Sequence, residues 1–304
     1  MKSAVVTGAG GFVGSWLVRE LTAQGTEVYA AVSESPQQRD IRMPGVHTLR
    51  CGMADYRLLP KMLNGADPEV FYHLAWTGVS GPARGSAESQ LNNAAGAVKA
   101  AEAAAALGCR RFVGMGSIAE RETAAAMALE GSRPSPDSLA GAGKFFAHCA
   151  TKTRCAQLGI EHVWPMLTNA YGEGERSVRL INDTIRKILM DEPLEFTAGT
   201  QLYDFIHAAD AARALRLLGC LGRPFCSYVV GSGLPRPLRE YLEELGGILA
   251  PGRELKFGSL PYTGAKLSPE AFDTAALVKD TGFSPEISFA EGVRRTFRWI
   301  KENG

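Results

Sequence analysis

A glycine-rich turn near the start of the chain constrains its fold more than any other feature. Gly8, Gly11 and Gly14 recur at three-residue intervals between an apolar strand at Ala4–Val6 and a helix predicted over Phe12–Gln24. Glycine permits the tight turn, lets a pyrophosphate approach the main chain and lets the helix pack close to the strand. Free N–H groups and the positive end of the helix then attract phosphate. The expected dinucleotide contacts come from Gly8, Gly10, Gly11, Phe12, Val13 and Gly14.

Strand and helix patterns alternate after this turn. This alternation favours a parallel sheet with right-handed crossovers, and apolar strands indicate burial on both faces. The fold class is therefore α/β, a Rossmann-type doubly wound parallel sheet with a smaller C-terminal lobe. The further strands are predicted at Glu27–Val32, Val46–Arg50, Val70–Ala75, Arg111–Met115 and His162–Met166.

The pattern changes after Gly172, and this change divides the chain. We assign residues 1–170 to the dinucleotide-binding domain. The segment 203–232 is expected to return to that domain, with Tyr203–Ile206 as a strand of the main sheet. Residues 171–202 and 233–304 are expected to form the smaller, substrate-binding lobe.

Composition excludes several classes of function. The chain has 33 basic and 32 acidic residues, a balance that does not support a nucleic-acid or membrane-surface partner. No apolar run approaches the roughly 20 residues of a membrane span, and no signal peptide is recognisable. The six cysteines form neither a CxxC pair nor a metal-binding cluster. We therefore expect a cytoplasmic protein with reduced thiols and no metal site.

The end of the second strand bears on the choice of cofactor. An acidic residue there would bind the ribose 2′-hydroxyl of NAD, but the strand ends at Val32. Ser33 and Arg39 offer groups for a 2′-phosphate, whereas Glu34 competes as a partner for a ribose hydroxyl. The sequence therefore favours NADP and leaves NAD open. Met53 is expected to contact the adenine through its main chain.

Motifs along nearly the whole chain resemble those of the extended short-chain dehydrogenase/reductase family. The glycine spacing agrees with this family, and so does the C-terminal segment Gly282–Pro285. The resemblance implies an NAD(P)-dependent enzyme that binds a nucleotide diphosphate sugar between its lobes. It also implies a homodimer, paired through the helices at Ser86–Leu107 and Leu139–Leu158. The other matching motifs are His73–Trp76, Asn93–Gly96, Phe112–Ser117, Asn169–Gly172 and Tyr203–Asp210.

The resemblance also implies roles for individual residues. Ser117 would polarise the reacting sugar oxygen, and Lys144 would hold the nicotinamide ribose with support from Asn93. Leu74, Ala75, Trp76 and Leu167 would line the nicotinamide and its ribose. The substrate contacts would come from Ser117, Asn169, Arg179 and Tyr203.

One residue of the family's catalytic set is missing. Its members carry a proton-exchanging tyrosine four residues before the lysine, and this chain has Ala140 there. The alanine could be an engineered change that traps substrate, or a natural loss or rerouting of the chemistry. Alternatively, another group exchanges the proton, either a water or His148, although His148 lies a full helical turn beyond Lys144.

Two functions remain in view. The first is an NAD(P)-dependent nucleotide-sugar epimerase or reductase that works without the tyrosine. The second is a catalytically silent protein that binds the same ligands. A sugar dehydratase is disfavoured, because Ile118-Ala119-Glu120 follows Ser117 in place of the Asp-Glu pair that expels a hydroxyl group.

Overall fold

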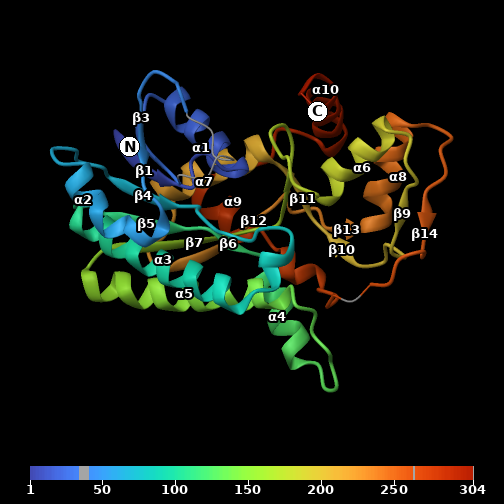
Figure 1. The fold of residues 1–304 in the computed structure, drawn as a ribbon, viewed down its shortest axis with the longest axis horizontal. Helices are drawn as coiled ribbons and strands as arrows, with labels where there is room; N and C mark the ends of the chain where they lie inside the picture. The colour runs from blue at the N-terminus through green and yellow to red at the C-terminus, as the bar shows by residue number, and fades with distance from the viewer. Residues whose placement is uncertain (34–40, 263, 304) are drawn as a thin grey trace.

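A parallel sheet forms the centre of the molecule in this computed structural model, which describes residues 1–33, 41–262 and 264–303. The strand order is β12-β7-β5-β4-β1-β2-β3, with β6 paired to β7, and every pairing is parallel. This confirms the Rossmann-type fold class (Figure 1). The strands are β1 (Ser3–Thr7), β2 (Glu27–Val32), β3 (Val46–Arg50), β4 (Val70–His73), β5 (Arg111–Gly114), β6 (Gly116–Ser117), β7 (Glu161–Leu167) and β12 (Cys226–Val230).

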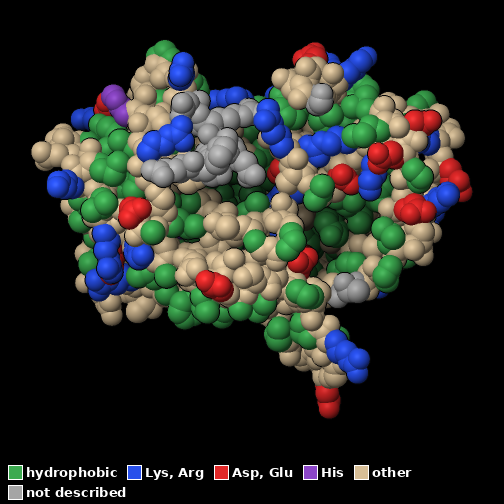
Figure 2. Space-filling model, viewed as in Figure 1, with side chains coloured by type: hydrophobic (Ala, Val, Ile, Leu, Met, Phe, Trp, Pro, Cys, Tyr) green, Lys and Arg blue, Asp and Glu red, His purple; other side chains and the backbone are tan. Residues whose placement is uncertain are grey.

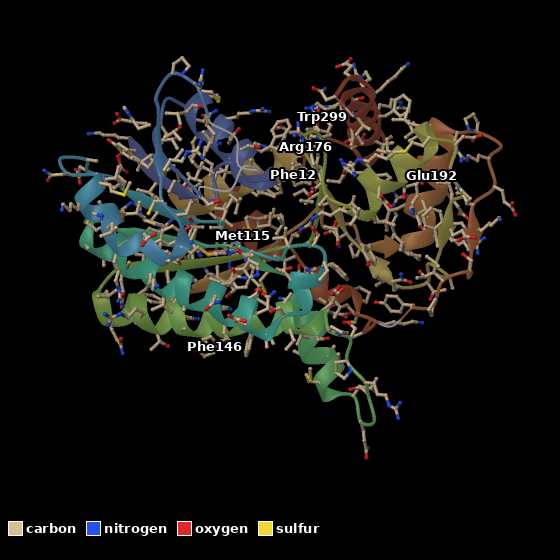
Figure 3. The ribbon with its side chains drawn as sticks, viewed as in Figure 1. Phe12, Met115, Phe146, Arg176, Glu192 and Trp299 are labelled. Carbon is tan, nitrogen blue, oxygen red and sulfur yellow. The ribbon has the colours of Figure 1, made fainter. Side chains whose placement is uncertain are left out.

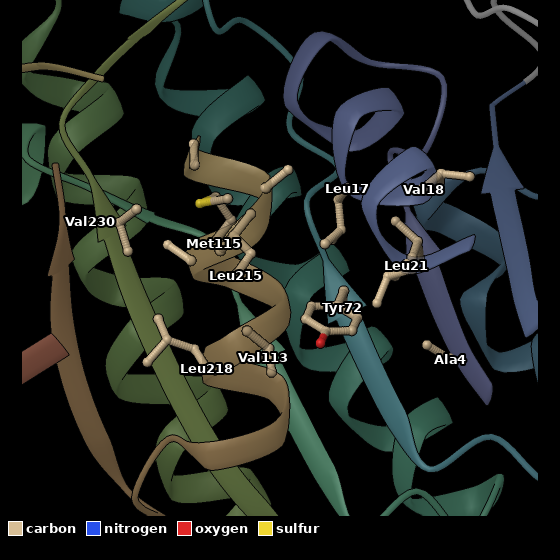
Figure 4. Packing of buried hydrophobic residues seen from close by; sticks show 14 of the residues in the cluster. Ala4, Leu17, Val18, Leu21, Tyr72, Val113, Met115, Leu215, Leu218 and Val230 are labelled. Carbon is tan, nitrogen blue, oxygen red and sulfur yellow. The ribbon is translucent and has the colours of Figure 1, made fainter. Parts of the chain in front are cut away.

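Helices bury both faces of the middle of this sheet, whereas the edge strand β3 has no fully buried residue. Alternate residues of β1 show the two faces, because Ala4 and Val6 belong to one hydrophobic cluster and Val5 to another. The first cluster packs under α1 and α7, and Figure 4 shows Leu17, Leu215 and Tyr72 meeting there. The second lies under α3 and α5. These helices are α1 (Phe12–Ala23), α3 (Ala87–Ala106), α5 (Ser138–Leu158) and α7 (Ala208–Leu221).

Shorter elements complete this part of the chain. After β3 the chain forms a 3-10 helix, η1 (Met53–Leu58), followed by the single α-helical turn α2 (Leu59–Met62). The helix α4 (Ala119–Ala128) projects from the body below the sheet (Figure 1). The remaining short helices are η2 (Pro82–Gly85), η3 (Pro269–Phe272) and α9 (Ala275–Thr281).

The smaller lobe has a hydrophobic core of its own. Ile185, Phe205, Leu242 and Val293 meet in this core, and they come from segments far apart in the sequence. The lobe lies at the carboxyl-terminal side of the sheet, on the right in Figure 1. Its elements are α6 (Leu180–Leu189), α8 (Leu238–Leu249), α10 (Phe289–Asn303) and the paired strands β9 (Glu195–Phe196) with β14 (Lys256–Phe257) and β10 (Leu202–Tyr203) with β13 (Arg236–Pro237).

The prediction that Tyr203–Ile206 joins the main sheet is wrong. Tyr203 pairs with β13, and β11 (Phe205–His207) pairs in parallel with β8 (Asn169–Tyr171) outside the main sheet. The chain changes partners at Asp204, whose buried carboxylate accepts hydrogen bonds from the main-chain N–H of Ser232 (2.9 Å) and of Gly233 (3.1 Å). This tie leaves strands too short to extend the sheet, and β12 takes the edge position instead.

Glu173 joins the two lobes at one corner. Its carbonyl oxygen accepts a hydrogen bond from the indole of Trp16 in α1 (2.9 Å). Its carboxylate contacts His207 at the end of β11 (2.7 Å) and Arg295 in α10 (2.9 Å). Three elements from the two hydrophobic cores therefore meet at a single residue.

Two searches of the described residues bear on ligand class. Among residues 1–33, 41–262 and 264–303, no helix has the length and apolar character required to traverse a bilayer. The same residues contain no group of three or more His, Cys, Asp or Glu side chains placed to hold a metal ion.

Candidate active site

The glycine-rich turn forms a cradle of main chain at the end of β1. Gly8 has a φ of 68°, and a Cβ there would lie 2.6 Å from the main-chain nitrogen of Ala75. A Cβ at Gly14 would lie 2.1 Å from the carbonyl oxygen of Gly8. No side chain in the described part of the chain caps the start of α1, and its first turn lacks acidic residues. The open N–H groups and the absent side chains fit a pyrophosphate.

The ends of β2 and β3 border the expected adenosine side of this cradle. The carbonyl oxygen of Ser33 accepts a hydrogen bond from the Arg50 guanidinium (3.1 Å), so a basic side chain lies beside Ser33. Arg39 and Glu34 lie outside the described residues. Met53 packs on α3, since a Cβ at Gly96 would lie 3.0 Å from the Met53 Cβ.

Asn93 fixes the loop that follows β4. Its side-chain oxygen accepts a hydrogen bond from the N–H of Thr77, and its amide donates to the carbonyl oxygen of Thr77, both at 2.8 Å. The adjacent Trp76 donates its indole N–H to the Gln90 side chain (2.9 Å). In these contacts Asn93 positions the loop bearing Trp76, and it reaches Lys144 only through that loop.

Lys144 is buried at the carboxyl end of β5. Its ammonium donates to the carbonyl oxygen of Met115 (2.6 Å) and lies 3.8 Å from the centre of the Trp76 ring. Burial lowers the pKa of Lys144 to about 7, against the opposing effect of the Glu120 charge. Burial therefore disfavours the charged form of Lys144, as expected of a side chain at a site that binds a polar ligand.

Ser117 ends β6, beside Leu167 in the adjacent strand. Its hydroxyl oxygen accepts a hydrogen bond from the N–H of Ala119 (3.2 Å), and its own N–H donates to the Glu120 carboxylate (2.9 Å). Leu74 continues from β4 at the same edge of the sheet, with its N–H on the carbonyl oxygen of Thr7 (3.2 Å). The structure thus brings Ser117, Leu167, Leu74 and the glycine cradle to the carboxyl-terminal edge of one sheet.

The position of the missing tyrosine lies on α5, one turn before Lys144. Ala140 is buried, and a Cβ on its neighbour Gly141 would lie 2.2 Å from the carbonyl oxygen of Ala119. The close packing of α4 on α5 therefore fixes the backbone at position 140. The alanine methyl group offers this site no proton to exchange.

His148 faces away from this position. Its ring stacks on Trp164 with centroids 4.7 Å apart, and its nitrogens contact Glu120 (3.4 Å) and Ser227 (3.1 Å). Because its ring packs on Trp164 of β7, His148 is not placed to replace a phenol at position 140.

A cavity of about 280 Å³ lies between α4 and the smaller lobe. Tyr203 lines it from the smaller lobe, and Arg84 and Glu122 line it from the main body. On the face drawn in Figure 2, the surface is hollowed between the two lobes. Arg84 and Glu122 could not be predicted from the sequence, because neither belongs to a motif and only folding brings them together.

The positive charge of Arg84, in the main body, acts on Arg179 at the start of α6 in the smaller lobe. Burial lowers the pKa of Arg179, Glu175 opposes this effect, and the positive charge of Arg84 lowers the pKa further. Arg179 pairs with Glu175 (3.2 Å), and Arg84 pairs with Asp137 (3.5 Å). Two cations that repel each other across a cleft fit an anionic ligand between them. Asn169 begins β8 in the smaller lobe, with its N–H on the carbonyl oxygen of Asp204 (3.1 Å).

Several known proteins are similar to this chain in sequence or in structure. A dTDP-glucose 4,6-dehydratase of Streptomyces niveus is 24% identical over 98% of this chain and 93% of the relative. A UDP-N-acetylglucosamine 4-epimerase structure from Methanobrevibacter ruminantium superposes with a TM-score of 0.83 at 22% identity, covering 100% of this chain and 99% of the other. MoeE5 in complex with UDP-glucuronic acid and NAD has a TM-score of 0.81 at 25% identity, with coverage of 99% and 100%.

A family-wide sequence profile agrees with these relatives. The profile of the NAD dependent epimerase/dehydratase family matches residues 4–231, which include the glycine cradle, Ser117 and Lys144. The chain therefore belongs to the NAD dependent epimerase/dehydratase family, within the extended short-chain dehydrogenases/reductases.

Proposed function

We propose that this chain binds a nicotinamide dinucleotide and a nucleotide diphosphate sugar, and acts as an epimerase or reductase at a sugar carbon. One observation carries the proposal: the glycine cradle, Ser117 and the buried Lys144 meet at the carboxyl-terminal edge of one parallel sheet. Ligands of open α/β sheets bind at this edge. Relatives named for reactions on dTDP- and UDP-sugars support the substrate class.

The proposed roles follow from the contacts of each residue. When bound, the nicotinamide would supply the group that gives or takes a hydride at the sugar carbon. The N–H groups of residues 8–14 would hold the pyrophosphate. Lys144 would turn its ammonium to the nicotinamide ribose, and Ser117 would donate its hydroxyl to the sugar oxygen. Arg84 and Arg179 would bind the diphosphate, with Asn169 beside them.

Ala140 determines how fast such a reaction can run. Proton exchange by a positioned side chain typically contributes about a hundredfold to ten-thousandfold in rate. Without a phenol, and with His148 turned away, we propose that a water at position 140 carries the proton at reduced rate. A silent binding protein is the second candidate, and the fixed but unreactive position 140 favours it.

The cofactor preference remains a proposal for NADP. It rests on the absence of an acid at the end of β2 and on the Arg50 guanidinium beside Ser33. The solved relative MoeE5 holds NAD, so both cofactors belong in any binding test.

We also propose a homodimer that pairs through α3 and α5. The exposed side chains of Leu91 in α3 and of Phe145 and Phe146 in α5 support this pairing. Figure 3 shows Phe146 on the outer face of α5, away from the sheet. Large apolar side chains gathered on one face of a helix pair are typical of a protein interface.

The test of the proposed function is to restore the phenol. We expect Ala140→Tyr to raise turnover of UDP- or dTDP-sugars by about a hundredfold or more, measured by cofactor absorbance and product analysis. Ala140→Phe is the matched control, because it adds the ring without the hydroxyl and should give no gain. If the unchanged chain already turns over at the rate of the tyrosine variant, the silent candidate is excluded. If calorimetry detects no binding of NAD or NADP, the whole proposal fails.

A further inference from the structure

The cavity beside α4 is lined by carboxylates and phenols to which the proposed chemistry gives no role, together with Arg84, which it assigns to the diphosphate. Glu122 and Asp137 line it with carboxylates, and Arg84 lines it with a guanidinium, so the lining carries a net negative charge. Tyr203 and Tyr262 enter from the smaller lobe. Ala119, two residues after Ser117, also borders the cavity, which therefore adjoins the proposed reacting position.

Glu122 differs from the other carboxylate of the cavity. Asp137 is 65% exposed at its side chain and already pairs with Arg84 (3.5 Å). Within the described residues, no hydrogen bond or ion pair reaches the Glu122 carboxylate. Burial raises the pKa of the Glu122 carboxyl, and Arg84 opposes this effect only in part. Glu122 is half-buried, so water reaches its carboxylate only in part, and a ligand that donates to it would supply a hydrogen bond that the protein does not.

The two phenols add donors and acceptors without positive charge. Burial raises the pKa of Tyr262 to about 12, and the Glu122 charge adds to this shift. Burial likewise raises the pKa of Tyr203, with Glu122 the next contribution. Both phenols therefore stay neutral at physiological pH. Arg84 alone supplies positive charge, and Asp137 already engages it.

We infer that Glu122 is a specificity-determining residue, which makes the α4 cavity accept a sugar carrying a neutral or cationic hydrogen-bond donor and reject a sugar carrying a carboxylate. The inference rests on the proposed function, since it assigns this cavity to the sugar of the nucleotide sugar. A carboxylate brought close to Glu122 would meet a like charge in a buried site. A hydroxyl or an ammonium group would satisfy the carboxylate, and the ammonium would gain most.

Calorimetric titration of sugar nucleotides tests this inference. The probes are UDP-glucose, UDP-glucuronic acid and UDP-glucosamine, each titrated into protein saturated with dinucleotide. UDP-glucose and UDP-glucuronic acid differ only in whether a hydroxymethyl or a carboxylate is present. We expect the unchanged chain to bind UDP-glucuronic acid at least about tenfold more weakly than UDP-glucose, and UDP-glucosamine at least as tightly as UDP-glucose.

The variant Glu122→Gln isolates the charge, because it keeps the shape of the side chain. We expect it to reduce the UDP-glucuronic acid penalty by about tenfold and to abolish any preference for UDP-glucosamine. Glu130→Gln is the matched control: it removes an exposed carboxylate that follows α4 and is not among the residues lining the cavity, so it should change either ratio less than about twofold. Thermal unfolding of each variant checks that the fold is retained.

The outcomes separate the inference from the proposed function. If all three probes bind and Glu122→Gln leaves their affinity ratios unchanged, the inference is overturned and the proposed function stands. If Glu130→Gln shifts the ratios as much as Glu122→Gln, the assignment to Glu122 is overturned. If dinucleotide binds but none of the probes does, the proposed substrate class fails, and the inference fails with it.

Discussion

The two ends of the proposed site differ in which part of the chain makes the contacts. The dinucleotide end is main chain, shaped by Gly8 and Gly14 and by a loop that Asn93 ties down. The reacting end consists of the side chains at 117, 140 and 144. At the dinucleotide end, the same groups also stabilise the fold. At the reacting end, burial lowers the pKa of Lys144. The groups proposed to bind the dinucleotide therefore also support the fold, whereas the reacting end depends on the side chain present at each position.

The largest effect is expected from a side chain in the cradle. Gly14→Val should lower the free energy of unfolding by about 3 kcal/mol and abolish dinucleotide binding, because its Cβ would overlap the carbonyl oxygen of Gly8. Chemical denaturation and calorimetry measure the two effects. Gly247→Ala is the control, since a Cβ there meets no atom within 4 Å, and it should leave stability unchanged or raise it. Wild-type dinucleotide affinity in Gly14→Val would contradict a cradle made of main chain.

A smaller loss of stability is expected where a side chain forms hydrogen bonds to the main chain. Asn93→Ala should lower the free energy of unfolding by about 2 kcal/mol, because it leaves the N–H and the carbonyl oxygen of Thr77 without partners. Dinucleotide affinity should fall as the loop loosens. The exposed neighbour Asn92, changed to alanine, should alter neither quantity. Equal stability of the two variants in urea would show that the loop does not depend on Asn93.

The smallest expected change in stability is a gain, and it tests the difference between the two ends of the site. At pH 7 we expect Lys144→Met to stabilise the ligand-free protein by about 1 kcal/mol, since it removes a buried cation. It should also weaken dinucleotide binding. Lys152→Met on the same helix is the control. A destabilised Lys144→Met would mean that the contacts with Met115 and Trp76 outweigh the desolvation of Lys144.

The pH dependence of that difference has a definite sign. The folded-state pKa of Lys144 is about 7, against 10.5 ordinarily, so between these values the unfolded chain binds more protons. Wild-type stability should therefore rise with pH across this window relative to Lys144→Met, and the advantage of the variant should shrink toward pH 10. Thermal denaturation at pH 7, 8.5 and 10 follows the trend. A constant difference would place the pKa of Lys144 near its ordinary value.

Sequence patterns predicted the parallel sheet because its strands are long, apolar and separated by helices. They failed for Tyr203–Ile206, where two short strands change partners at Asp204, since strand periodicity does not say which neighbour a short strand joins. The edge strand Cys226–Val230 was not assigned for the same reason. Around the site, motifs indicated Ser117, which ends a strand, and Lys144, which lies in the helix α5. Arg84 and Glu122 have no motif, and only folding places them on one cavity with Tyr203.

The contacts of Glu173 affect how the molecule unfolds. One residue there holds α1 from the larger core, α10 from the smaller core and His207 between them. These contacts couple the two cores, because opening either core disturbs a residue that the other also contacts. Heating should therefore unfold the lobes in a single cooperative event, with equal calorimetric and van't Hoff enthalpies, although each lobe has its own hydrophobic interior.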